Sequence, residues 1–383
     1  MTNEITKTVF LAGCGGGYDI FGGLPHYFKI KSSENYDVTL INYSFTKRHL
    51  LSKYSQQLTT LLFRVDPRLD VIWLTDDVYF PEQRLANELQ VPIYAILCDY
   101  DETRIELIIE AYKYLIQERT IDELILIDGG SDVLLTGNEK QLGTPVEDMS
   151  HARAVHLLSS DKVKSKYIVV IGTNLEVGHG VHKSDIDTRL TALSSHAIFT
   201  WLWQYEHDDA VRYYVDIFTR CCPRHSIVHS LICAALQGRT GYYLPEHLRS
   251  RITKSIVSIG EETCVSTGYH FDDVMRENVY FERLTPALNL RQVHDVILIA
   301  QGLVNQCSEN EEYTCGSTCI ETCNYKPQIC VLMCRSEYHD ITLPKDLVET
   351  NDFPWIEHVD KVARALDAFS PDRNGWIDKS FHI

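Results

Sequence analysis

The feature that most constrains the fold is a short apolar strand that stops at an acidic, glycine-rich turn. Residues 124–127 (Leu-Ile-Leu-Ile) run directly into residues 128–132 (Asp-Gly-Gly-Ser-Asp). Buried parallel strands read as nearly continuous apolar runs, and ligands of open α/β sheets bind beyond the carboxyl ends of the strands. The stretch therefore predicts a parallel strand whose end opens into a small-molecule site.

Short apolar strands and helical patterns alternate along the first half of the chain. The apolar runs predict strands at residues 8–12, 37–42, 69–74, 91–97, 124–127 and 167–172. Apolar residues at helical spacing predict helices over residues 101–117 and about 144–158. This alternation predicts an α/β fold, a doubly wound, mostly parallel Rossmann-like sheet.

The simplest domain organisation is one α/β domain over residues 1–383. We expect its core at about 8–180 and 226–369, interrupted by a helical segment at about 185–225 in which Pro223 separates two helices. Further strands are predicted at residues 256–259, 296–300 and 329–333, and a closing amphipathic helix at residues 355–369.

A cysteine-rich insertion is predicted at about residues 305–327. Six of the 12 cysteines lie between Cys307 and Cys334, and their spacing does not match the paired two-residue spacing of common zinc ribbons. Zinc is therefore not expected there. Disulfides are rare in the cytosol, so a surface insertion with free thiols is favoured.

The net charge of −17 narrows the range of partners. Nucleic acids and anionic membranes are bound by clustered Lys and Arg, so neither is expected. No window approaches the roughly 20 apolar residues of a membrane span, and the first residues lack the pattern of a secretory signal. We expect a cytoplasmic protein, and a homo-oligomer is compatible with the sequence.

A second glycine-rich strand end follows the first predicted strand. Residues 13–17 (Gly-Cys-Gly-Gly-Gly) suit an anion-binding turn, because glycine allows positive φ and close approach of the backbone. Tyr18 replaces the last glycine of the dinucleotide fingerprint, so NAD is not indicated. The candidate ligand-binding residues are Gly13, Gly15, Gly16, Gly17 and Asp19. The alternatives are a tight strand-to-helix turn and, for Asp19, a helix cap.

The acids after residue 127 are the strongest candidates for chemistry. Asp128 and Asp132 are four residues apart with small residues between them, and with Asn138 they offer the oxygen ligands that magnesium or manganese prefers. One of the two acids could instead act as a base. Gly129 and Gly130 are expected to contact the ligand. The alternative is helix capping.

Other polar groups are weaker candidates. In the turn after residue 172, Glu176 is a candidate acid–base group and Thr173 and Asn174 are candidate ligand contacts, although a mobile loop fits equally well. Arg239 could reach an anionic substrate. His225 and His229 share a helical face and are expected to be structural, and residues 143–148 read mainly as a helix start with Thr144 as its N-cap.

Taken together, these motifs resemble the family called domain of unknown function 1152. The resemblance is carried by residues 12–19, by residues 128–132 with 137–139 and 143–148, and by the helix over residues 226–238. It covers roughly residues 8–300 and implies a fold, since the family has no established activity. The cysteine-rich stretch departs from the family pattern.

The acidic strand end also looks like short segments of two metal-using groups. One group is the metal-dependent carbohydrate phosphatases of the domain-89 type, and the other is mitochondrial D-glutamate cyclase; both likenesses are analogies. We expect an enzyme that binds a small anionic metabolite, phosphorylated or nucleotide-like, and hydrolyses it with a divalent metal. The alternatives are a metal-dependent lyase or cyclase on an amino-acid-like substrate and a non-catalytic nucleotide- or metabolite-binding module.

Overall fold

The computed structural model of the chain describes most of its first 301 residues. The described residues are 6–33, 35–70, 74–75, 78–117, 119–139, 141–177, 180–222, 226–249 and 257–301. The predicted strand at 329–333, the helix at 355–369 and the cysteine-rich insertion lie outside them.

The described chain folds around a nine-stranded mixed sheet with the strand order β3-β4-β5-β2-β1-β6-β7-β11-β8. The strands are β1 (Lys7–Gly13), β2 (Tyr36–Ser44), β3 (Gln56–Gln57), β4 (Leu62–Val65), β5 (Ile93–Leu97), β6 (Ile121–Asp128), β7 (Val163–Ile171), β8 (Ala197–Leu202) and β11 (Val265–His270). The five central strands pair in parallel. Only β4 and β11 run in the opposite direction, because each pairs antiparallel with both of its neighbours. The predicted Rossmann-like α/β fold with a mostly parallel sheet is confirmed.

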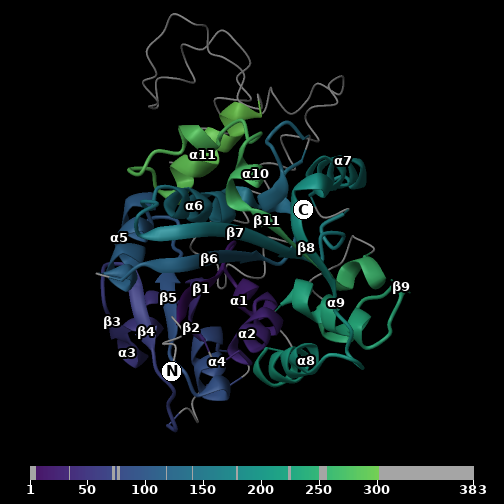
Figure 1. Cartoon of the computed structure of the whole chain (residues 1–383), viewed down its shortest axis with the longest axis horizontal. Helices are drawn as coiled ribbons and strands as arrows, with labels where there is room; N and C mark the ends of the chain where they lie inside the picture. The colour runs from purple at the N-terminus through teal and green to yellow at the C-terminus, as the bar shows by residue number, and fades with distance from the viewer. Residues whose placement is uncertain are drawn as a thin grey trace, which may run out of the picture.

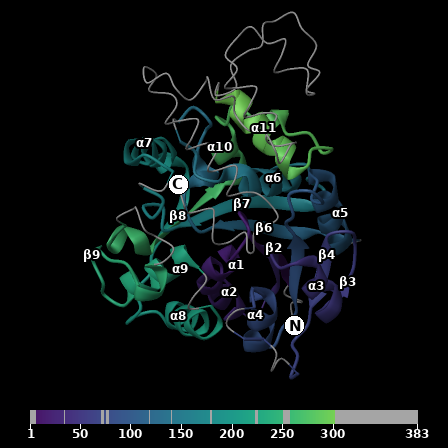
Figure 2. The same cartoon turned by 180° about the vertical axis from the view of Figure 1, so that it is seen from behind.

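Helices cover both faces of the sheet (Figures 1 and 2). They are α1 (Asp19–Gly22), α2 (Leu24–Lys31), α3 (Arg48–Tyr54), α4 (Pro81–Leu89), α5 (Ile105–Ile116), α6 (Pro145–His156), α7 (Lys183–Leu193), α8 (Asp209–Cys221), α9 (Ile227–Leu236), α10 (Phe271–Met275) and α11 (Leu290–Ala300). In Figure 1, α1, α2, α4 and α8 lie on one side of the central strands, and α5, α6, α10 and α11 lie on the other. A two-stranded sheet of β9 (Gly241–Tyr242) and β10 (Ser258–Ile259) stands apart from the main sheet.

The strand order reverses between β1 and β6. From β1 the chain moves outward through β2 to β5, and it then returns to the other side of β1 to form β6 and β7. Such a reversal leaves the helices that follow the two strands on opposite faces, so the loops at their carboxyl ends diverge and leave room for a ligand. Gly13 is paired with Ile127, so the glycine-rich turn after β1 and the acidic turn after β6 begin side by side.

The central strands form because their apolar runs can be buried on both faces. Phe10, Leu11 and Ala12 of β1 and Leu126 and Ile127 of β6 are fully buried. Parallel strands covered by helices on both sides need such continuous apolar sequence. The helix expected over residues 101–117 is α5, and the one expected over residues 144–158 is α6.

Three predictions about secondary structure need correction. The segment 185–225 is not wholly helical, because β8 lies in it as an edge strand whose side chains are largely exposed. Residues 296–300 end helix α11 rather than form a strand, since Val293 and Ile297 are buried together at helical spacing. The strand expected at 69–74 does not begin there: Leu69 is 99% exposed, and the strand nearest in sequence is β4.

The sequence prediction also missed β11, whose residues (Val-Ser-Thr-Gly-Tyr-His) are mostly polar or small. Of the strand expected at 256–259, Ser258 and Ile259 form β10. Within the described ranges, no helix combines the length and the apolar character that crossing a membrane requires.

Candidate functional site

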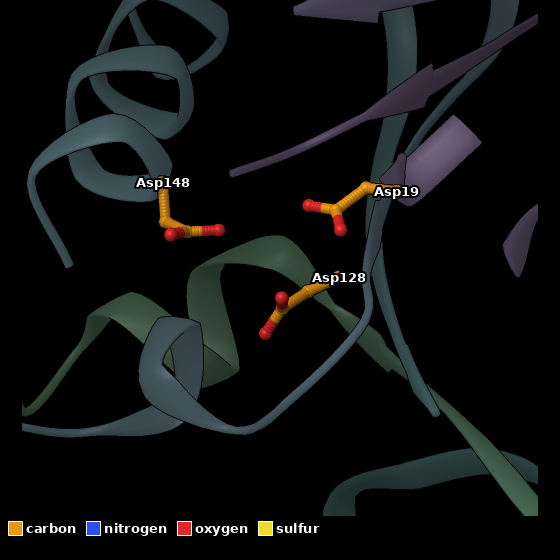
Figure 3. A group of neighbouring side chains, drawn as sticks. All are labelled: Asp19, Asp128 and Asp148. Atoms are coloured by element: carbon orange, nitrogen blue, oxygen red, sulfur yellow. The ribbon is translucent and has the colours of Figure 1, made fainter. Parts of the chain in front are cut away.

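Three carboxylates converge beyond the carboxyl ends of β1 and β6. Asp19 is the first residue of α1, Asp128 is the last residue of β6, and Asp148 lies in the first turn of α6. One carboxylate oxygen from each lies within 4.8 Å of the other two (Figure 3). Asp128 and Asp148 are each only 3% exposed, and Asp19 is half-buried. We refer to these three residues as the aspartate triad.

Close packing against carboxylates explains the glycines at positions 15 and 130. A Cβ atom at Gly15 would stand 2.5 Å from Oδ1 of Asp148, and one at Gly130 would stand 2.7 Å from Oε1 of Glu176. Real Cβ contacts are never that short, so only glycine lets these carboxylates approach the backbone. The glycines predicted to contact a ligand therefore also make room for acidic side chains of the protein itself.

The turn after β1 has the conformation expected of a glycine-rich loop. Gly16 and Gly17 have φ values of 92° and 65°, in a region of backbone conformation that residues other than glycine rarely adopt. The Gly15 amide donates to Oδ2 of Asp19 at 2.7 Å, so one amide of the turn already binds a carboxylate of the chain. Within the described ranges, the amides of Gly16 and Gly17 donate to no acceptor.

Burial and like charge together raise the pKa values of the triad. Burial, with a smaller contribution from the nearby Asp132, raises the pKa of Asp19 to about 8, although the hydrogen bond from Gly15 opposes the rise. The pKa values of Asp128 and Asp148 are also well above the usual range, first because of burial and then because of the neighbouring acids. No Lys or Arg in the described part of the chain forms an ion pair with the triad.

Two oxygens of the triad are left without partners. Oδ2 of Asp128 and Oδ1 of Asp148 are buried and accept no hydrogen bond. A buried polar atom without a partner carries the full cost of its desolvation. Carboxylate oxygens arranged in this way suit a hard divalent cation, so the triad fits magnesium or manganese.

Asp132 and Glu176 flank the triad and are held by the protein. Oδ2 of Asp132 accepts from the amide and hydroxyl of Thr144 at 3.1 and 3.3 Å, which ties it to the start of α6. Oε2 of Glu176 accepts from the amide and hydroxyl of Ser131 at 2.7 and 2.6 Å. Burial, followed by the charge of Asp132, raises the pKa of Glu176 to about 8. At neutral pH, Glu176 therefore mostly keeps its proton.

Four of the predicted site residues do not join this cluster. Asn138 is exposed and donates to Oγ1 of Thr136 in its own loop. Asn174 is anchored elsewhere, since its amide donates to the Ser258 carbonyl and the Thr263 hydroxyl. Thr173 lies half-buried in the turn after β7, and Arg239 is exposed with its guanidinium 5.8 Å from the Tyr243 ring. No hydrogen bond or ion pair joins these four side chains to the triad.

The sequence analysis missed Asp148 and its neighbour Glu147. Acids in the first turn of a helix are common because they complement its dipole, so this pair did not stand out from ordinary capping. Glu147 accepts a hydrogen bond from the Tyr100 hydroxyl at 2.9 Å, and burial raises its pKa to about 7. The sequence signal that could have identified Asp148 was the position of this helix start, which directly follows the acidic loop.

Comparison of the chain with protein-family models, with curated proteins and with solved structures finds no match in any of the three. The resemblance to domain of unknown function 1152 stays a prediction from the motifs.

Proposed function

We propose that this protein is a metal-dependent enzyme that hydrolyses a small anionic metabolite, phosphorylated or nucleotide-like. Asp19, Asp128 and Asp148 would hold one divalent cation, magnesium or manganese. The observation that carries the proposal is the convergence of three carboxylates within 4.8 Å, with two buried oxygens that lack partners.

The cation is proposed because the triad is otherwise unfavourable. Two unit negative charges 4.8 Å apart repel by about 3.5 kcal/mol at an effective dielectric constant of about 20. Without a cation the site relieves this repulsion by keeping protons, and the repulsion adds to the rise in pKa that burial causes first. A divalent ion replaces those protons and supplies the partners that the buried oxygens lack.

The substrate is proposed to be anionic because of what surrounds the triad. The site lies at the reversal of strand order, where small molecules bind in sheets of this kind. The amides of Gly16 and Gly17 are free to donate to a phosphate or carboxylate group. The bound cation would polarise the substrate and activate water. Glu176 would donate a proton to the leaving group, a role supported by its raised pKa of about 8 in the metal-free protein.

Calorimetric titration with manganese and with magnesium tests the proposal. The wild-type protein is expected to bind one ion, and Asp128→Asn is expected to bind at least tenfold more weakly. Asp187→Asn is the control, because Asp187 is exposed and its carboxylate pairs with Lys183 away from the triad. Absence of binding to the wild-type protein would refute the proposal. A thermal-shift screen of phosphorylated metabolites with the bound metal would then identify the substrate class.

A non-catalytic metabolite-binding module is the competing function. It is favoured by the hydrogen bonds from Thr144 and Ser131 that already satisfy Asp132 and Glu176. Such a module would bind the metabolite and release it unchanged. Incubation of metal-loaded protein with the screened ligand, followed by product analysis, separates the two functions.

We also propose a cytoplasmic location and membership of the family called domain of unknown function 1152. Six described cysteines are all unpaired and buried, which supports a reducing compartment. The motifs that carry the family resemblance contain all three residues of the triad.

A further inference from the structure

We propose that His229 is a substrate-binding residue of this site, and that its Nε2–H donates a hydrogen bond to an oxygen of the anionic metabolite beside Asp19. The inference rests on the proposed function. It assigns a hydrogen-bond donor role to His229, which was expected from the sequence to be structural.

His229 is held firmly at one ring nitrogen. It lies in the first turn of α9, where the Ser226 hydroxyl caps the helix and accepts from the His229 amide at 3.1 Å. The ring is only 1% exposed, and its Nδ1 is 2.8 Å from the hydroxyl of Tyr214 in α8. Phe21 and Phe218 pack around it. These contacts fix both the position and the rotation of the imidazole.

The other nitrogen is buried, has no hydrogen-bond partner and lies near Gly129, beside Asp19. Nε2 of His229 accepts from and donates to nothing within hydrogen-bond geometry. The position that a Cβ atom would take on Gly129 is 3.7 Å from Nε2 and 3.1 Å from Oδ1 of Asp19. The imidazole and the Asp19 carboxylate thus approach the same point beside Gly129, where the glycine has no side chain to separate them.

Another buried histidine shows what a structural role requires. In His151, Nδ1 is 3.0 Å from the Cys14 carbonyl and Nε2 is 2.7 Å from the Tyr112 hydroxyl, so both nitrogens are satisfied. In His229 only one is. A histidine kept for packing alone would leave a desolvated donor or acceptor unpaired at a cost that a phenylalanine avoids. A ligand oxygen removes that cost.

The protonation state suits a donor at Nε2. Burial lowers the pKa of His229 to about 4, so the ring is neutral at pH 7. The Tyr18 carbonyl is near enough to oppose this shift, although it is not in hydrogen-bonding geometry with Nε2. When the Tyr214 hydroxyl donates to Nδ1, the ring proton resides on Nε2 and points to Gly129.

The test uses manganese alone and then inorganic phosphate added to the manganese-saturated full-length protein, both by calorimetry. His229→Phe keeps a ring of similar size without a donor, and His229→Gln keeps a donor close to the position of Nε2. We expect His229→Phe to raise the Kd for phosphate about tenfold and to change the Kd for manganese less than twofold. His229→Gln is expected to recover part of the phosphate affinity.

The outcomes separate this inference from the proposed function. If the wild-type protein binds no manganese, the proposed function fails. If it binds manganese but no phosphate, or if His229→Phe and His229→Gln bind phosphate as tightly as the wild type, the assignment of His229 is overturned. Equal losses in both variants would also overturn it, because they indicate disturbed packing rather than a lost donor.

Discussion

Replacing Asp148 by Asn should stabilise the metal-free protein and abolish its response to metal. The substitution keeps the shape of the side chain, removes one negative charge and breaks no hydrogen bond, because the Asp148 carboxylate accepts none in the described part of the chain. One carboxylate oxygen of Asp19 and one of Asp128 each lie within 4.8 Å of an oxygen of Asp148. Each of these pairs, when both groups are charged, costs about 3.5 kcal/mol at an effective dielectric constant of about 20.

The size of the effect depends on pH with a definite sign. The folded-state pKa of Asp148 is raised by burial and by the neighbouring acids. Stability from such a group is fully present below its unfolded pKa of about 4 and is lost as the pH rises toward the folded value. Asp148→Asn should therefore change little at pH 4. Because retained protons relieve part of the repulsion, we expect a gain of about 2 kcal/mol at pH 8.

Thermal unfolding with and without manganese measures both effects. For a chain of this size, 2 kcal/mol corresponds to a rise in Tm of about 2–3 °C. Manganese at 100 times its Kd should stabilise the wild type by about 2.7 kcal/mol and leave Asp148→Asn nearly unchanged. The Tm advantage of Asp148→Asn over the wild type is thus expected to shrink or reverse when metal is added.

Glu82→Gln is the matched buried control. Glu82 is also fully buried, but its carboxylate accepts from the Asn42 amide at 2.6 Å and the Thr46 hydroxyl at 2.7 Å. This variant should lose about 1–3 kcal/mol and keep the manganese response. The reasoning is refuted if Asp148→Asn lowers the Tm at pH 8 without metal, or if it still gains stability from manganese.

Three further predictions follow from individual contacts. Gly15→Ala should weaken manganese binding at least tenfold in calorimetry while circular dichroism stays native, because its Cβ would stand 2.5 Å from the Asp148 carboxylate. Burial lowers the pKa of His151 to about 4, so the stability that its neutral ring contributes is present above pH 6.5 and is lost as the pH falls toward 4. In urea unfolding, the wild type should therefore lose about 3 kcal/mol of its stability advantage over His151→Gln between pH 7 and pH 4. Arg189→Ala should cost about 3 kcal/mol in the same assay, because the buried guanidinium donates to the carbonyls of Leu134 and Val274; a loss below 1 kcal/mol would contradict this.

Elements that depend on local pattern were predictable. Strands β1 and β6 were recognised because strands buried on both faces need uninterrupted apolar sequence, and helix α6 because Thr144 and Pro145 mark its start. Strands β8 and β11 were missed for the converse reason. They lie at the antiparallel edge, where exposed or small side chains are tolerated and backbone pairing with neighbours far along the chain decides the conformation.

The sequence alone was enough to predict the α/β fold and the position of the candidate site, because apolar runs that stop at glycines and acids specify buried strands with polar ends. It identified Asp19 and Asp128 as candidates on the same grounds. Only the tertiary structure decided which acids meet. Asp148 reaches the site because α6 begins beside the glycine turn, Asn138 remains exposed in its own loop, and His229 approaches Asp19 from a helix 210 residues further along the chain. Such convergence depends on strand order and helix packing, which no local pattern encodes.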